Sequence, residues 1–228
     1  MKRIAIYVEG DAELIFVRNF LLKWYDYDTE RLGIECCKLR ADREDYEPYP
    51  HGTQESENFY YIVNVGNDSS VLSKMIKNAE RLYNSGYQLV VGLRDMYCDA
   101  YHEKTHIVNK GRVIDRDIID KFRKGSRETI QNGNYPVEMQ MHFAIMEIEA
   151  WLLGLSETLD AGIDPENAFY HPASEIVNHF SGVLTSYGKH KSEVEKLTGR
   201  FTKDDFVKLL SSDKCASLRI FAEAIVEI

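Results

Sequence analysis

Apolar runs that suit buried strands alternate with segments of helical periodicity along the first part of the chain. Strands are predicted at residues 4–8, 34–39, 59–65 and 87–93, and helices at residues 12–24 and 69–84. Strands that alternate with helices usually pair in parallel and are joined by right-handed crossovers. The alternation therefore predicts an α/β fold with a mainly parallel sheet flanked by helices.

The pattern becomes helical towards the C-terminus. A helix is predicted at residues 113–131, a strand at 137–146 and a helix at 147–155, and short helices separated by glycines follow. The polar stretch 40–58 contains two prolines and is predicted as a loop. We therefore expect an α/β core over residues 1–155 and a helical extension over residues 156–228.

Composition fits a globular protein that lies outside the membrane. Of the 228 residues, 44% are hydrophobic and 29% are charged, which is enough for a sizeable core. No apolar stretch approaches the roughly 20 residues of a membrane span, and the N-terminus lacks the pattern of a signal peptide. We therefore expect a cytoplasmic protein whose four cysteines are reduced and mostly buried.

Charge is unevenly distributed along the chain. The formal net charge of -9 argues against binding nucleic acid by electrostatic attraction alone. However, residues 103–127 hold 8 bases against 4 acids, and residues 187–219 hold 8 bases against 5 acids. An acidic centre with basic flanks is one interpretation of this distribution, and solvated helix faces are the other.

Carboxylates follow several of the predicted strands. Glu9 ends the first strand, Asp95 follows the strand at 87–93, and Glu147 and Glu149 follow the strand that ends at residue 146. Because the carboxyl ends of parallel strands meet at one edge of a sheet, these acids are expected to converge there. Converging carboxylates need a cation or protons among them, and oxygen ligands suit Mg²⁺ or Mn²⁺. Since Glu147 and Glu149 share a face only on a strand, one of them is expected to be structural.

The acids also have structural explanations. Asp11 and Glu13 fall in the first turn of a predicted helix, where the helix dipole favours negative charge. Asp95 could pair with the neighbouring Arg94 or with another base at the end of its strand, and Asp99 could open a turn.

Five short motifs follow one another along the chain. They are YVEGDAE at 7–13, RDMYCD at 94–99, EIEAWLL at 147–153, YGK at 187–189 and CASLRIF at 215–221. The first motif and the later strand-end Asp resemble the TOPRIM fold of topoisomerases, primases and OLD-type nucleases. The whole series is similar to small stand-alone bacterial TOPRIM-like proteins, domain-of-unknown-function family 4276. A TOPRIM-like sheet with a C-terminal helical extension is what this resemblance implies.

The resemblance also implies metal-dependent phosphodiester chemistry on a nucleic acid substrate. Glu9, Asp95 and Glu149 are the implied catalytic residues. The implied ligands of Mg²⁺ or Mn²⁺ are Glu9, Glu13, Asp95, Asp99, Glu147 and Glu149. TOPRIM proteins usually carry Asp-x-Asp after the later strand, whereas Met96 and Tyr97 follow Asp95 in this chain, so another acid has to replace the missing ligand. Defence against phage or mobile DNA, with a partner ATPase, is implied by the likeness to OLD-type nucleases.

Several other side chains could contact a nucleic acid. Phosphate clamps are predicted at Lys189, Lys191, Arg219 and Arg112, with ordinary surface charge as the alternative for each. Tyr97 and Trp151 could stack on a base, although Trp151 lies in an apolar run that is typical of a core.

Two other interpretations stay open. The first is a catalytically degenerate TOPRIM-like module that acts through protein–protein interaction, which the missing acid favours. The second is a zinc site formed by Cys98, His102 and His106, which are four residues apart and would share one face of a helix. A fourth zinc ligand is not visible, and the segment has no apolar stripe that would predict a helix.

Overall fold

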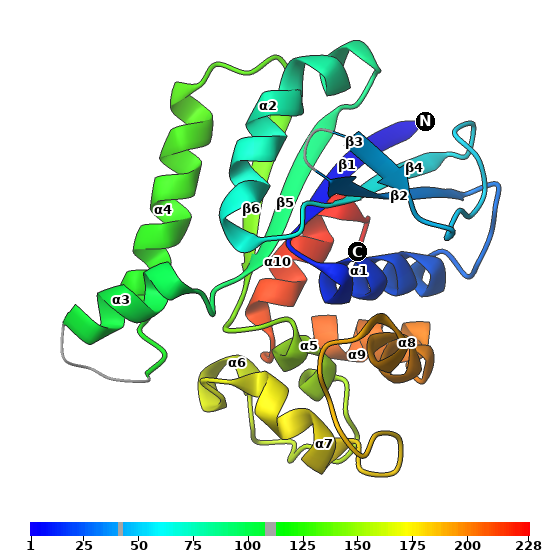
Figure 1. Cartoon of the computed structure of the whole chain (residues 1–228). Helices are drawn as coiled ribbons and strands as arrows, with labels where there is room; N and C mark the ends of the chain where they lie inside the picture. The colour runs from blue at the N-terminus through cyan, green and yellow to red at the C-terminus, as the bar shows by residue number, and fades with distance from the viewer. Residues whose placement is uncertain (41–42, 108–112) are drawn as a thin grey trace. The chain divides into compact units, whose positions relative to one another are not determined.

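The structure is a computed structural model that describes residues 1–40, 43–107 and 113–228 (Figure 1). The chain forms two compact units. The first unit comprises Met1–Arg94 and Gly125–His142, and the second comprises Asp95–Lys124 and Phe143–Ile228. This partition differs from the predicted division at residue 155, which stays a prediction.

Six strands form a single sheet in the order β3-β2-β4-β1-β5-β6. Their bounds are β1 Lys2–Val8, β2 Leu32–Arg40, β3 Arg43–Tyr46, β4 Asn58–Asn64, β5 Leu89–Asp95 and β6 Glu138–Ala144. Strand β1 is parallel to β4 and β5, and β2 is parallel to β4, whereas β3 is antiparallel to β2. The predicted α/β fold with a mainly parallel sheet, flanking helices and C-terminal helices is confirmed.

Both faces of the sheet in the first unit are covered by helices. On one face, Ala5 and Tyr7 of β1 belong to a buried cluster with Val71 and Met75 of α2, which spans Val71–Asn84. Because side chains alternate along a strand, the fully buried Ile4 and Ile6 of β1 point to the opposite face. Helix α1, Asp11–Trp24, packs against β2 and β4 and covers that face.

The other helices lie in the second half of the chain. They are α3 Asp99–Ile107, α4 Arg116–Asn132, α5 Glu149–Gly154, α6 Pro165–Ala168, α7 Ile176–His179, α8 Lys191–Gly199, α9 Lys203–Leu210 and α10 Ala216–Ile225. Most are short, as the frequent glycines predict. They belong to the second unit, except that the C-terminal part of α4 belongs to the first.

Two elements were not predicted. Strand β3 lies within the predicted loop 40–58, where three consecutive charged residues, Arg43, Glu44 and Asp45, pair with β2 and hide its strand pattern. Helix α3 lacks an apolar stripe, but tertiary hydrogen bonds hold it. Tyr101 is buried, and its hydroxyl donates to the carbonyl of Val113 (2.9 Å) and accepts from the N–H of Asp115 (2.6 Å).

The structure also bears on the membrane and on the cysteines. Within the described residues, no helix has the length and apolar character that crossing a membrane requires. All four cysteines are buried free thiols, as predicted. Burial raises the pKa of Cys36 and of Cys37 to about 12, so both are uncharged at neutral pH.

Candidate metal centre

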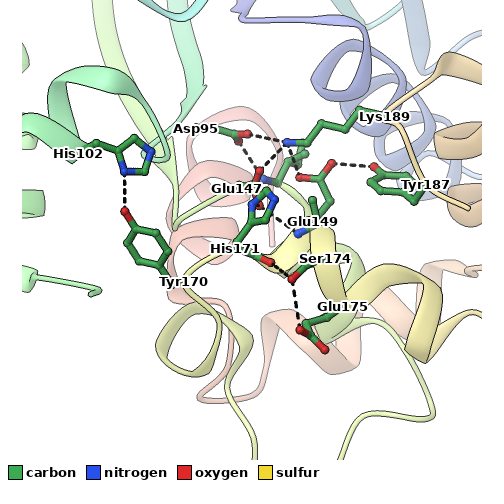
Figure 2. Close-up of polar contacts among 12 residues, drawn as sticks. Asp95, His102, Glu147, Glu149, Tyr170, His171, Ser174, Glu175, Tyr187 and Lys189 are labelled. Atoms are coloured by element: carbon green, nitrogen blue, oxygen red, sulfur yellow. Dashed lines mark hydrogen bonds and ion pairs between the residues drawn. The ribbon is translucent and has the colours of Figure 1, made fainter. Parts of the chain in front are cut away.

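Three buried carboxylates lie together in the second unit (Figure 2). Asp95 is the last residue of β5, Glu147 lies between β6 and α5, and Glu149 is the first residue of α5. One oxygen atom of each lies within 4.8 Å of the others. Their exposed fractions are 4%, 2% and 0%, respectively. We call this group the acidic triad.

Backbone pairing beyond the strand ends brings the three acids together. The N–H of Met96 donates to the carbonyl of Ala144 (2.9 Å), and the N–H of Tyr97 donates to the carbonyl of Met146 (2.7 Å). The two segments therefore run in the same direction past β5 and β6. The N–H of Ile148 then donates to Asp95 Oδ1 (2.8 Å). Convergence at the ends of strands is thus observed for these three predicted ligands.

The ammonium group of Lys189 lies among the three carboxylates (Figure 2). Its Nζ is 2.9 Å from Glu147 Oε1, 3.0 Å from Glu149 Oε2 and 3.4 Å from Asp95 Oδ2. Burial alone would lower the pKa of Lys189, but the three carboxylates together raise it above its ordinary value. Lys189 is therefore protonated, and its ammonium occupies the position predicted for a metal cation, while its predicted role as a phosphate clamp stays a prediction.

The triad carboxylates have further fixed partners. Glu147 Oε2 accepts a hydrogen bond from the N–H of Ala173 (3.0 Å) and lies 2.8 Å from Nδ1 of His171. The hydroxyl of Tyr187 donates to Glu149 Oε1 (2.7 Å). By contrast, Glu149 Oε2 meets Lys189 as an ion pair without an aligned hydrogen bond. That oxygen atom therefore keeps unused capacity as a ligand.

The cluster gathers several acids around one ammonium group. The three carboxylates all contact Lys189, in a region where burial makes uncompensated charge costly. A cation or protons can offset the repulsion between such carboxylates. Since every ligand atom is a carboxylate oxygen, a hard cation such as Mg²⁺ or Mn²⁺ fits the donor set, provided that it takes over oxygen atoms now facing Lys189.

Four rings pack together beside the triad. Tyr97 stacks on His171 with ring centroids 4.8 Å apart and an interplanar angle of 22°. His102 and Tyr170 approach Tyr97 edge-on, at 4.5 and 5.6 Å. Nδ1 of His102 lies 2.5 Å from the hydroxyl of Tyr170, and Cys98 is buried. Among described side chains no zinc group forms around Cys98 and His102, and the side chain of His106 lies outside that set.

The N-terminal acids belong to the first unit and are not members of the triad. Glu9 and Glu13 therefore stay predicted ligands only. Asp11 contacts Lys38 Nζ (3.4 Å) and Asn64 Nδ2 (2.5 Å), which fits its structural explanation. Gly10 has an extended backbone with φ −150°, so a tight turn is not the reason for glycine. A side chain there would lie 3.0 Å from a Glu13 oxygen.

Other predicted nucleic-acid contacts lie outside the triad. Arg219 donates to the carbonyl of Ser212 (3.2 Å), and Lys191 begins α8. Arg112 lies outside the described residues. Trp151 is fully buried, and its indole N–H donates to Ser217 Oγ (2.9 Å), so it belongs to the core and does not present a face to a base.

The structure also bears on the explanations of two predicted acids. Arg94 pairs with Asp68 (3.0 Å), and Asp95 pairs with another base, Lys189, which its structural explanation allows. Asp99 is exposed at the start of α3 and is not a member of the triad, so its role as a ligand stays a prediction. Both Glu147 and Glu149 are members, because the turn into α5 orients their side chains to the same side despite the spacing of two.

Sequence reasoning missed His171 and gave Tyr187 no role of its own. The YGK motif contains Tyr187 and Lys189, so it was the signal that could have identified the hydroxyl bonded to Glu149. No pattern marks His171, which precedes a proline between two short helices.

No protein-family model matches the chain, and neither a curated protein nor a solved structure matches it. The resemblance to TOPRIM proteins therefore stays a prediction that depends on short motifs.

Proposed function

We propose that this protein is a nuclease or related phosphodiester phosphotransfer enzyme that uses Mg²⁺ or Mn²⁺ held by Asp95, Glu147 and Glu149. The observation that carries the proposal is the buried triad, whose three carboxylates converge on one ammonium group at a spacing that could hold a metal ion. The short motifs shared with TOPRIM proteins support the choice of phosphodiester chemistry. Defence against phage or mobile DNA remains part of the proposal on that resemblance alone.

The protein supplies ligand atoms whose orientation is already fixed. Asp95 Oδ1 and Glu147 Oε2 accept backbone N–H groups, so these carboxylates need little rearrangement before they bind a cation. A bound cation would supply activation of a water molecule and stabilisation of charge on the phosphate oxygens. Lys189 contacts all three carboxylates, and its partly exposed side chain would be available to a phosphate oxygen if a metal took over the carboxylates.

Calorimetric titration with Mn²⁺ tests the proposal directly. We expect wild-type protein to bind with a sub-millimolar dissociation constant, and Asp95→Asn or Glu149→Gln to weaken binding by roughly 10-fold or more, because each variant removes a charged ligand. Glu157→Gln, which changes an exposed acid of the second unit, is the matched control and should bind like wild type. Glu9→Gln and Glu13→Gln decide whether these two predicted ligands take part.

Cleavage assays complete the test. Supercoiled DNA and single-stranded RNA are incubated with wild-type protein and Mg²⁺ or Mn²⁺, and Asp95→Asn should abolish any activity found. Failure of wild-type protein to bind Mn²⁺ and to cleave either substrate would contradict the proposal.

A second candidate is the degenerate module, and the position of Lys189 favours it. An ammonium that contacts all three carboxylates can replace the cation permanently and make the cluster a structural element. In that case wild-type protein does not bind Mn²⁺, whereas Lys189→Met, which vacates the position, does. The same titration therefore separates the enzyme from the module.

A further inference from the structure

We infer that the outer face of the His171 ring is a stacking site for an unpaired nucleobase of the substrate. This inference rests on the proposed function and narrows its substrate to nucleic acid with at least one base out of a duplex. The ring is a flat surface beside the triad, and it is both exposed and fixed in place.

The exposure of His171 is confined by its neighbours. Tyr97 covers one face of the imidazole ring at 4.8 Å, yet 46% of the side chain remains accessible to solvent. This exposure belongs to parts of the side chain that Tyr97 does not cover. No described residue contacts Nε2, so that edge of the ring is also available to a ligand.

Two contacts hold the stacked pair against the triad. Nδ1 of His171 lies 2.8 Å from Glu147 Oε2, and the backbone N–H of Tyr97 donates to the carbonyl of Met146 (2.7 Å). Tyr97 is further supported edge-on by His102. A ring held in this way loses little freedom when a ligand stacks on it, so the contact contributes more of its energy to binding.

The chemistry of the site selects an unpaired base. Every nucleobase has a π-face that stacks on an aromatic ring, whereas bases within a duplex are covered on both faces by their neighbours. Stacking also gives affinity without a basic surface, which suits a chain whose net charge is -9. His171 contacts a triad carboxylate directly, so a base stacked on it would lie close to the proposed metal centre.

Three substitutions at His171 separate stacking from its contact with Glu147. His171→Phe keeps a flat ring but loses the contact, His171→Gln keeps a hydrogen-bond donor but loses the ring, and His171→Ala loses both. The affinity of each variant is measured by fluorescence anisotropy with dye-labelled, single-stranded DNA and RNA of about 12 nucleotides. A blunt-ended duplex serves for comparison. Asp95→Asn is present in every protein so that cleavage cannot interfere.

We expect the Phe variant to bind single strands like its parent, and the Gln and Ala variants to bind them roughly 5- to 150-fold more weakly. In a second set of oligonucleotides, an abasic site replaces each base in turn. An abasic site at one position should weaken binding as much as the loss of the His171 ring does. Duplex binding should not depend on residue 171. Circular dichroism of each variant checks that it is folded.

Several results would overturn the inference. They are equal binding by the Gln variant and its parent, equal losses in the Phe and Ala variants, or no single-strand binding at all. Any of these leaves the nuclease proposal intact if Mn²⁺ binding and cleavage still depend on Asp95. Conversely, stacking without metal binding would disprove the nuclease and retain the base site.

Discussion

Acidic residues follow strands in both units, but their side chains make different contacts. In the first unit, Glu9, Asp11 and Glu13 lie within five residues of sequence, and Asp11 is engaged by Lys38 and Asn64 at the start of a helix. In the second unit, Asp95 and Glu147 are 52 residues apart, yet both contact the same ammonium group.

The difference shows that closeness in sequence is a poor guide to a shared site. Asp11 and Glu13 are two residues apart in the first turn of α1 and point in different directions, so the EGDAE motif spreads its charges. Acids at the ends of adjacent parallel strands are brought together by the sheet, whatever the length of chain between them. The following predictions test this contrast, from the largest expected effect to the smallest.

Removal of the ammonium group should have the largest effect. Lys189→Met leaves three buried carboxylates without their cation and should lower the free energy of unfolding by about 3 kcal/mol. This value is at the low end of the range for broken buried ion pairs because 36% of the Lys189 side chain is exposed to solvent. Urea unfolding in EDTA measures the loss, with Lys191→Met as the matched control. Millimolar Mn²⁺ should restore stability if the triad binds metal.

The pH dependence of that loss has a definite sign. The folded state raises the pKa of Lys189. The contribution of this lysine to the free energy of unfolding is therefore complete below the pKa of an unfolded lysine, and it is lost only as pH rises through the pKa of Lys189 in the folded state. The difference between wild type and Lys189→Met should therefore stay constant from about pH 6 to about pH 9. A difference that vanishes within this window would mean that the ammonium does not stabilise the triad.

Substitution of Glu166 should have a smaller effect on stability. Glu166 is a buried acid of the second unit, and its carboxylate accepts hydrogen bonds from Trp151 and Ser217. Burial raises its pKa, although hydrogen bonds from Ser217 and Trp151 oppose the shift. Its protonated form is therefore favoured in the folded state, and stability should fall as pH rises through the folded pKa. In Glu166→Gln, the midpoint of urea unfolding should depend less on pH over this range than it does in wild type. An unchanged profile would show that hydrogen bonds alone compensate the charge.

The smallest effect is expected in the first unit. Asp11→Asn weakens a partly exposed ion pair with Lys38 and removes a charge from a helix start, which together should cost about 0.5 kcal/mol in urea unfolding. Binding of Mn²⁺ should not change. A loss comparable with that of Lys189→Met would break the contrast between the two sets of acids.

Most of the fold could be predicted from periodicity because β1, β2, β4 and β5 are apolar runs with strong strand propensity. Strand β3 could not, since its charged residues acquire strand structure only by pairing with β2. For the same reason α3 was missed, because the bonds of the Tyr101 hydroxyl to a distant segment hold it. Local patterns report local preferences, and these elements depend on partners elsewhere in the chain.

The amino-acid sequence by itself determined the α/β alternation, the buried thiols and the placement of Asp95, Glu147 and Glu149 at or just after strands. Only the tertiary structure decided which cation compensates them and that His171 and Tyr187 contact them. The physical reason is that burial and charge balance are properties of a three-dimensional environment. The lysine that meets the triad follows Asp95 by 94 residues, and no spacing rule connects the two.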